Sequence, residues 1–254
     1  MSQKTCLLGI DIGTSACKLV VFAPDGAALA SRTVAYPTQY PKPGYAEQNP
    51  DDWWNAVCRG LNDLFAEGVV SAWDIAGIGI DGQGWSAIAL DAEGNVLAPD
   101  PIWLDTRAED ICEELKAGVG NDAIFALSGN PLKAQYVTAK ILWLERHMPQ
   151  AFQQTNAIMQ SNGFIAYRLT GAITMDISQG YGLHCFDMRT GRIDEAMRYA
   201  LGISQHLIPE IVPCHSVVGR VSAEAARQTG LLTGTPVVAG GLDAACSTLG
   251  AGVL

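Results

Sequence analysis

The sequence predicts an α/β domain built on a mixed sheet. Over the first 35 residues, short apolar runs alternate with turn signals, which is typical of consecutive antiparallel strands. From Arg107 onward, longer segments with helical spacing and capping residues follow one another. The last 20 residues return to an apolar run, paired glycines and an acid. Strands at both ends of the chain favour one sheet flanked by helices, with further helices inserted.

Three strands are expected near the N-terminus, separated by turns at residues 11–14 and 24–26. They form an antiparallel meander, because connections this short join strands as hairpins. Two further strands are predicted beyond the first helix, and a glycine-containing turn at residues 91–95 follows the second of them. The expected strands cover residues 6–10, 16–22, 27–35, 73–80 and 85–90.

The first helix has a clear start signal. Residues 36–50 contain four prolines, which predicts a surface loop. Asn49 is then a suitable N-cap and Pro50 suits the first helical position. The stripe that this helix buries comprises Trp53, Val57, Leu61 and Leu64. Later helices are expected over residues 108–116, 122–127, 137–147 (stopped by Pro149), 161–169, 194–200, 223–228 and 244–249.

Composition narrows the range of functions. The 254 residues are 48% hydrophobic and 17% charged, which excludes a disordered protein. The formal net charge of −10 argues against nucleic acid as a partner, and no apolar segment is long enough to suggest a membrane. Seven cysteines without a C-x-x-C pair predict reduced thiols in a cytoplasmic protein. The default expectation is a small-molecule ligand.

Residues 11–15 (DIGTS) have the composition of a phosphate-binding turn. Gly13 lets backbone N–H groups approach phosphate oxygens, Thr14 and Ser15 add hydroxyl donors, and Asp11 can hold Mg²⁺ through water. An ordinary hairpin turn, with Asp11 bonded to its own backbone, explains these residues equally well. Lys18 on the next strand could meet a phosphate, although a solvated edge lysine is the more common case.

A second acid, Asp243, follows Gly240 and Gly241 at a predicted strand-to-helix junction. A carboxylate beside a helix N-terminus stays ionised and can accept a hydroxyl proton. Its alternative role is a plain N-cap of the last helix. Two strand-end acids with glycine turns are what in-line phosphoryl transfer needs, one near the metal and one near the attacking hydroxyl. Asp11 and Asp243 together therefore favour a phosphotransferase.

Four motifs, taken in order, resemble the FGGY family of carbohydrate kinases, and the xylulokinases within it. They are residues 8–15 (LGIDIGTS) with Lys18, residues 82–83 (GQ), residues 102–107 (IWLDTR) and residues 240–243 (GGLD). The resemblance implies ribonuclease-H-like domains of the actin and hexokinase type, each with a five-stranded mixed sheet flanked by helices. It also implies ATP and Mg²⁺ as cofactors and a sugar as substrate, and it is compatible with a homodimer.

The resemblance assigns roles residue by residue. Asp243 matches the catalytic base, and Asp11 lies near the metal ion, which it holds through water, and the phosphates. Gly13, Thr14, Ser15 and Lys18 correspond to the phosphate-binding positions. Residues expected to contact the sugar, besides Asp243, are Gln83, Gly84, Trp85, Trp103 and Asp105. From the residues alone, Trp103 could equally be a core residue and Asp105 could cap the helix that begins near Arg107.

Two departures from xylulokinases bear on the substrate. Residues 82–86 read GQGWS, so that an indole stands at Trp85 where xylulokinases typically carry histidine, and Ala244 stands where they often have asparagine. A buried sugar hydroxyl that loses its partner costs about 1 to 3 kcal/mol. The resemblance implies a pentulose such as xylulose, or a related ketose or polyol, as substrate. The two departures argue against xylulose itself and leave a related pentulose, a polyol or an aldonate open.

The expected function is ATP-dependent phosphorylation of such a sugar. The alternative is a non-catalytic relative, either a sugar sensor or an actin-like nucleotide-binding protein. Residues 1–235 are expected to form the N-terminal sugar-binding domain, and residues 236–254 the beginning of a C-terminal ATP-binding domain. Because the family's adenosine contacts would then follow Leu254, these 254 residues alone are expected to be inactive.

Overall fold

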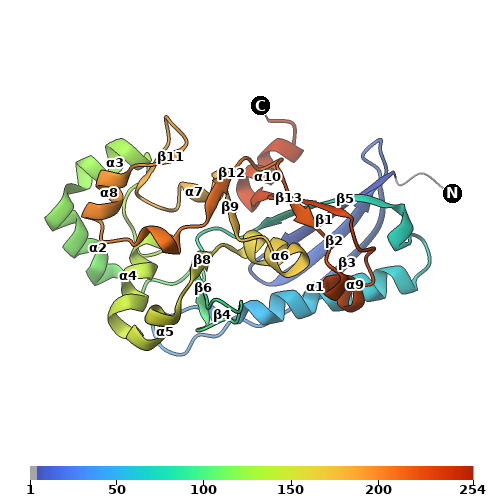
Figure 1. Cartoon of the computed structure of the whole chain (residues 1–254), viewed down its shortest axis with the longest axis horizontal. Coiled ribbons are helices and arrows are strands. Elements are labelled where there is room, and N and C mark those ends of the chain that lie inside the picture. Colours follow the sequence, from blue (N-terminus) through green and yellow to red (C-terminus); the bar gives the residue numbers. More distant parts are fainter. Residues whose placement is uncertain (1–4, 254) are drawn as a thin grey trace.

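The computed structural model describes residues 5–253, and a seven-stranded mixed sheet is its largest feature (Figure 1). The predicted meander is confirmed, because β1 and β2, and then β2 and β3, pair antiparallel. On its other side β1 pairs in parallel with β5, so the sheet is mixed. The sheet runs in the order β13 (Val217–Arg220), β14 (Pro236–Val238), β5 (Ile75–Gly82), β1 (Cys6–Ile12), β2 (Ala16–Phe22) and β3 (Ala28–Ala35), and β15 (Gly241–Leu242) also pairs with β5.

The sheet has seven strands where five were expected, and the difference lies at the end near the C-terminal segment. β14 and β15 pair in parallel with β5, and β13 pairs antiparallel with β14. Residues 236–242 therefore belong to this sheet, although the sequence suggested a new domain from residue 236. The position of the domain boundary stays a prediction, and Leu254, the last residue of that range, lies outside the described residues.

One face of the sheet is covered by three helices, α1 (Pro50–Ala66), α6 (Ser161–Thr170) and α9 (Ala223–Thr229) (Figure 1). The predicted start of α1 is confirmed, since the Asn49 side chain accepts a hydrogen bond from the Asp51 amide at 3.1 Å. The stripe of Trp53, Val57, Leu61 and Leu64 is fully buried. α10 (Asp243–Gly250) lies on the opposite side of the sheet (Figure 1).

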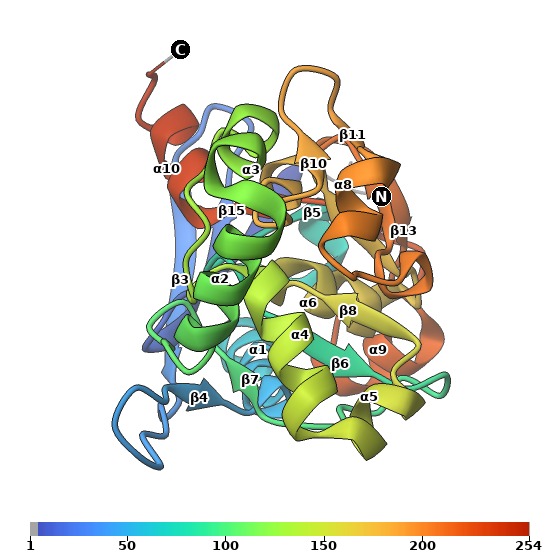
Figure 2. The same cartoon turned by 90° about the vertical axis from the view of Figure 1, so that its left-hand side faces the viewer.

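A second, mainly helical layer extends from the end of the sheet and has its own hydrophobic core (Figure 2). Its predicted helices are confirmed to within two residues at each end as α2 (Glu109–Leu115), α3 (Asn121–Ser128), α4 (Val137–His147) and α8 (Glu195–Ala200). Pro149 ends α4 as expected but also begins a further helix, α5 (Pro149–Gln154), because proline suits a first helical position. A π-helical turn, η2 (Lys116–Gly120), joins α2 to α3.

Short elements connect the two layers. The strand expected over residues 85–90 is shorter, because Trp85 adopts a left-handed backbone with φ of 65° and only β6 (Ile88–Leu90) pairs. The remaining elements are β4 (Glu47–Gln48), β7 (Asp100–Pro101), β8 (Ala157–Met159), β9 (Thr174–Asp176), α7 (Ile177–Gly180), β10 (Phe186–Asp187), β11 (Arg192–Ile193), β12 (Glu210–Val212), and the 3₁₀ turns η1 (Ala72–Asp74) and η3 (Gln205–Leu207). Among residues 5–253, no helix combines the length and apolarity needed to cross a membrane.

Candidate active site

Three carboxylates converge where the central strands of the sheet end. Parallel pairing of β1 with β5 sets Asp11 beside Asp81. β15 then pairs with β5 so that Gly241 lies beside Asp81, and Asp243 begins α10 two residues later. Because the carboxyl ends of parallel strands meet at one edge of a sheet, residues far apart in sequence share this position. The structure thus brings together the two acids that the sequence singled out.

All three carboxylates have pKa values above the ordinary range, chiefly because they are buried. Burial raises the pKa of Asp11, the charge of Asp243 raises it further, and Lys18 opposes both. Burial, together with Asp11 and Asp243, raises the pKa of Asp81 to about 7. The pKa of Asp243 is also raised by burial, against a hydrogen bond from the Ala244 amide. Such a concentration of negative charge favours binding of a cation.

A pocket of about 370 Å³ adjoins Asp11 and Asp81 on the sheet face opposite α1. Side chains alternate along a strand, so the buried Ile10 points to the helices while Gly9 and Asp11 face the pocket. Gly9 and Gly79 leave this part of the sheet without side chains. The residues lining the pocket are Gly9, Ile10, Asp11, Lys18, Val20, Phe22, Gly79, Ile80, Asp81, Gly240 and Cys246.

Asp81 is the member of this site that sequence reasoning missed. A signal was present, because residues 79–81 repeat the Gly-Ile-Asp of residues 9–11 at the end of another predicted strand. What was missing was the register of β1 against β5, which sets the two acids side by side. Within residues 5–253, no group of three His, Cys, Asp or Glu side chains is arranged to hold a metal ion. A cation here would need ligands from water or from a bound phosphate as well.

The predicted phosphate turn is held from several sides. The Gly13 carbonyl accepts a hydrogen bond from the Tyr36 hydroxyl at 2.6 Å, and the Thr14 carbonyl accepts one from Gln48 Nε2 at 2.7 Å. Thr14 Oγ1 accepts a hydrogen bond from Trp103 Nε1 at 2.9 Å. Ser15 completes the turn, and Lys18 lies across from Asp11 in the antiparallel register. The turn therefore touches Trp103, which the sequence assigned to the sugar pocket.

The predicted sugar strip, residues 83–85, lies next to this turn and carries unused hydrogen-bonding atoms. Gln83 is 1% exposed and donates from Nε2 to Gln48 Oε1 at 2.7 Å. Gln83 Oε1 and Trp85 Nε1 are buried without a hydrogen-bond partner among the described residues. A Cβ at Gly84 would approach Leu242 Cδ1 to 2.6 Å, so this glycine permits close packing against β15. The strip thus offers one free acceptor and one free donor.

Asp105, predicted to contact the sugar, forms hydrogen bonds inside the protein. Its side chain is fully buried, and its two oxygens accept hydrogen bonds from the Ala46 amide and from the amide and guanidinium of Arg107. It does not cap a helix, since α2 begins only at Glu109. With both oxygens engaged, Asp105 orders the loop that carries Trp103. Direct contact between Asp105 and a sugar stays a prediction to which this geometry gives no support.

Comparison with known proteins identifies the family of the chain. Residues 6–250 match the N-terminal domain of the FGGY family of carbohydrate kinases. The chain belongs to this family. It is 33% identical to a xylulose kinase of Bacillus subtilis (strain 168) over 248 residues, which are 98% of this chain and 50% of that protein. A xylulose kinase of Escherichia coli (strain K12) is 31% identical over 247 residues, 97% of this chain and 50% of its own length.

Solved structures of FGGY family members superpose closely on the chain. The xylulose kinase from Rhodospirillum rubrum gives a TM-score of 0.93 at 32% identity, covering 98% of this chain and 51% of that one. A gluconate kinase from Lactobacillus acidophilus gives 0.90 at 27% identity, with 97% and 50% covered. The predicted actin- and hexokinase-type fold class is thereby confirmed. The chain spans about half the length of the relatives it matches.

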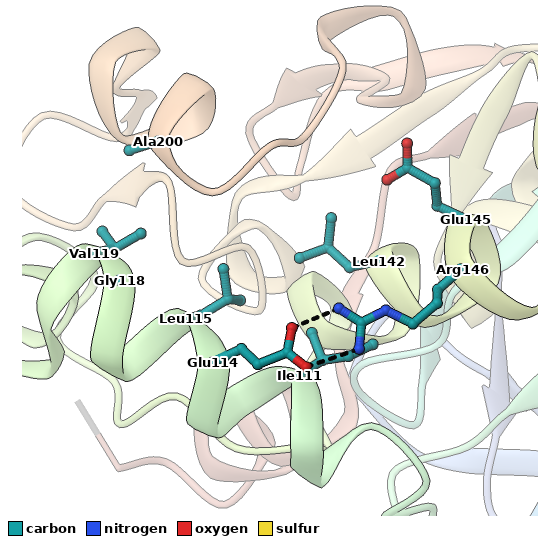
Figure 3. A pocket seen from close by; sticks show the side chains of 9 residues that line it. All are labelled: Ile111, Glu114, Leu115, Gly118, Val119, Leu142, Glu145, Arg146 and Ala200. Carbon is teal, nitrogen blue, oxygen red and sulfur yellow. Dashed lines mark hydrogen bonds and ion pairs between the residues drawn. The ribbon is translucent and has the colours of Figure 1, made fainter.

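The helical layer of this FGGY family member contains a larger pocket, of about 830 Å³ (Figure 3). Figure 3 shows Arg146 of α4 reaching across to Glu114 of α2, and the two form a pair of hydrogen bonds. Glu145 and mainly apolar residues, among them Leu115 and Leu142, line the rest of the pocket. None of the three carboxylates and none of the predicted site residues lies there, so size alone does not identify the site.

Buried His184, whose ring packs on that of Tyr136 next to Trp85, contributes a pH dependence to stability. Burial lowers its pKa to about 4, from an ordinary 6.5. Its ring nitrogens lie 3.1 Å from Thr138 Oγ1 and 3.3 Å from the Pro131 carbonyl oxygen. Between pH 6.5 and 4 the unfolded chain binds a proton that the folded chain does not. The contribution of His184 to the free energy of unfolding should therefore fall by about 3 kcal/mol over this window, whereas Asp81 and Asp100, with pKa values raised by burial to about 7 and about 6, contribute in the opposite direction.

Urea unfolding of wild type and His184→Gln between pH 7 and 4 isolates this contribution. The difference in free energy of unfolding between the two proteins should change by about 3 kcal/mol over this window, because glutamine does not titrate. The exposed His147, replaced in the same way, should keep the wild-type dependence. Equal slopes for wild type and His184→Gln would show that His184 does not control it.

Proposed function

We propose that this chain is the sugar-binding part of an ATP-dependent carbohydrate kinase, which transfers the γ-phosphoryl group of ATP to a hydroxyl of a small sugar. The observation that carries the proposal is the convergence of Asp11 and Asp243 beside the Thr14 turn and the Gln83 strip. Phosphoryl transfer requires a metal-side acid, a base and an oriented hydroxyl within one site. Membership of the FGGY family supports the same reaction.

Asp243 is the proposed base. It is the first residue of α10, and its Oδ1 accepts a hydrogen bond from the Ala244 amide at 2.6 Å, which orients the carboxylate. Burial raises its pKa, so it has more affinity for a proton than an exposed aspartate. The role of Asp243 is to receive the hydroxyl proton as the sugar oxygen bonds to phosphorus, while the phosphorus bond to the ADP oxygen breaks.

Asp11 and the turn at residues 13–15 are proposed to bind the phosphate end of ATP. The negative charge that Asp11 shares with Asp81 and Asp243 fits a divalent cation. Bound Mg²⁺ would neutralise charge on the phosphoryl oxygens, with Asp11 holding it through water. Lys18, opposite Asp11 in the sheet, is positioned to pair with a phosphate oxygen.

The sugar is proposed to be a pentulose such as xylulose, or a related ketose or polyol. Gln83 Oε1 accepts and Trp85 Nε1 donates, so each can bond a sugar hydroxyl. Trp103, 38% exposed beside the phosphate turn, supplies an apolar face for the sugar carbons. The xylulose and gluconate kinases among the relatives support substrates of this size.

A coupled assay of ADP release tests the proposed function. The native protein, purified at its natural length, is given Mg-ATP and, in turn, D-xylulose, L-xylulose, D-ribulose, glycerol or gluconate. At least one compound should raise ADP release by at least about tenfold over ATP alone. Binding of a sugar without any rise would instead favour the non-catalytic sensor.

Replacing Trp103 by alanine should weaken binding of the identified sugar by about 1 to 3 kcal/mol, because a stacking face is lost. Saturating sugar should also change tryptophan fluorescence in the wild type and change it less in this variant. The matched control is Trp73→Ala, since Trp73 is 71% exposed on η1, outside the site. Unchanged sugar affinity in Trp103→Ala would remove this residue from the pocket.

A further inference from the structure

Lys140 of α4 is a buried charged side chain that the proposed mechanism does not use. It is 1% exposed, and lysine is rarely buried this completely without partners. Its Nζ donates to the carbonyl oxygen of Trp85 at 2.7 Å and to that of Ile102 at 2.9 Å. One ammonium group therefore joins two separate segments of backbone.

Both segments belong to the proposed sugar subsite. The first segment carries Trp85, which has a φ of 65° and is the only non-glycine residue among residues 5–253 with a left-handed backbone. A non-glycine residue keeps such a conformation only where its surroundings hold it there. The second segment continues from Ile102 directly into Trp103, whose ring bonds the phosphate turn. The Lys140 ammonium thus sets the spacing between the two backbone segments that carry Trp85 and Trp103, which form two walls of the proposed sugar subsite.

The charge of Lys140 is balanced inside the protein. Burial lowers its pKa to about 8, while Asp100 and Asp105 favour its charged form. Asp100 is fully buried, and its Oδ1 accepts a hydrogen bond from the Ala87 amide at 2.7 Å, two residues after Trp85. Asp100 and Lys140 therefore hold neighbouring parts of the same strip. A methionine in place of Lys140 would fill similar space but donate to neither carbonyl.

We propose that Lys140 is a positioning residue of the sugar subsite, which fixes Trp85 and Trp103 relative to each other through their backbone. The proposal rests on the proposed sugar-kinase function for the identity of the ligand. The positioning role itself can be tested without turnover. The predicted effect is local: losing the two hydrogen bonds should loosen the backbone segments that carry Trp85 and Trp103 and leave strands β1 and β2 unchanged.

The test compares Lys140→Met with wild type in the native-length protein. Amide hydrogen exchange should accelerate by at least about tenfold in residues 84–87 and 102–105, and remain unchanged in β1 and β2. The KM for the sugar found in the assay above, with D-xylulose as the first probe, should rise by at least about tenfold, while the KM for ATP changes less than about twofold. If the single variant does not fold, the double variant Asp100→Asn/Lys140→Met removes both charges and keeps an acceptor for the Ala87 amide.

Thr229→Val is the matched control. Thr229 is equally buried on α9, where its hydroxyl donates to the Ala225 carbonyl at 2.7 Å, outside the sugar strip. It should lower stability without loosening either wall or changing the KM for sugar. Unchanged exchange in both segments of the Lys140 variants, or the same acceleration in Thr229→Val, would overturn the positioning role. Failure of wild type to phosphorylate any sugar would overturn the proposed function alone, because the exchange comparison does not need turnover.

Discussion

Replacing Asp243 by asparagine is expected to lower kcat for sugar phosphorylation by at least about 10³-fold, while the affinity for sugar stays within about tenfold of wild type. Asparagine has the same shape and can keep the hydrogen bond from the Ala244 amide. It cannot take the proton from the attacking hydroxyl. Steady-state kinetics with the native-length protein, together with sugar binding followed by fluorescence, separate the two effects.

Asp81→Asn is the control for this prediction, because it also removes one carboxylate from the same group and conserves shape. Burial, Asp11 and Asp243 raise the pKa of Asp81 to about 7, so this carboxyl is already partly protonated at neutral pH and its replacement removes little charge. Its effect on kcat should be much smaller than that of Asp243→Asn. Sugar-dependent turnover that survives in Asp243→Asn and disappears in Asp81→Asn would place the base at Asp81.

Adding one methyl group at Gly240 should destabilise the protein by about 3 to 5 kcal/mol, enough to unfold a domain of ordinary stability. Gly240 has φ of +77°, and a Cβ there would lie 1.7 Å from the Ile80 carbonyl oxygen, which is backbone of β5. Neither the strain nor the collision can be relieved by rotating a side chain. Because this turn leads into Asp243, any folded Gly240→Ala protein should also lose activity.

Gly234→Ala provides a matched comparison. Gly234 also has positive φ, of +88°, but a Cβ added there would meet no atom of residues 5–253 within 4 Å. The backbone cost alone applies there, so a loss of about 1 to 2 kcal/mol is expected. Urea unfolding of both variants measures the difference. Equal losses in the free energy of unfolding at the two positions would show that the contact with Ile80 adds nothing to the cost of a Cβ at Gly240.

Local signals account for the parts of the fold that the sequence predicted well. The Asn49 cap, the apolar stripe of α1 and the turns of the first meander depend on residues close together in the chain. Such signals act through caps, periodicity and backbone preferences, which need no knowledge of distant partners. The strand-end acids Asp11 and Asp243 were recognisable for the same reason.

Sequence patterns were enough to identify the residue types at the strand ends, and with them the expected phosphoryl-transfer chemistry. Which of these groups share a site depends on how the chain folds. The register of β1 against β5 added Asp81, and Arg107 folding back on Asp105 occupied both oxygens of that carboxylate. Only packing of α4 against the strip brought Lys140 to the carbonyls of Trp85 and Ile102. Such pairings follow from strand register and long-range packing, which local sequence patterns do not specify.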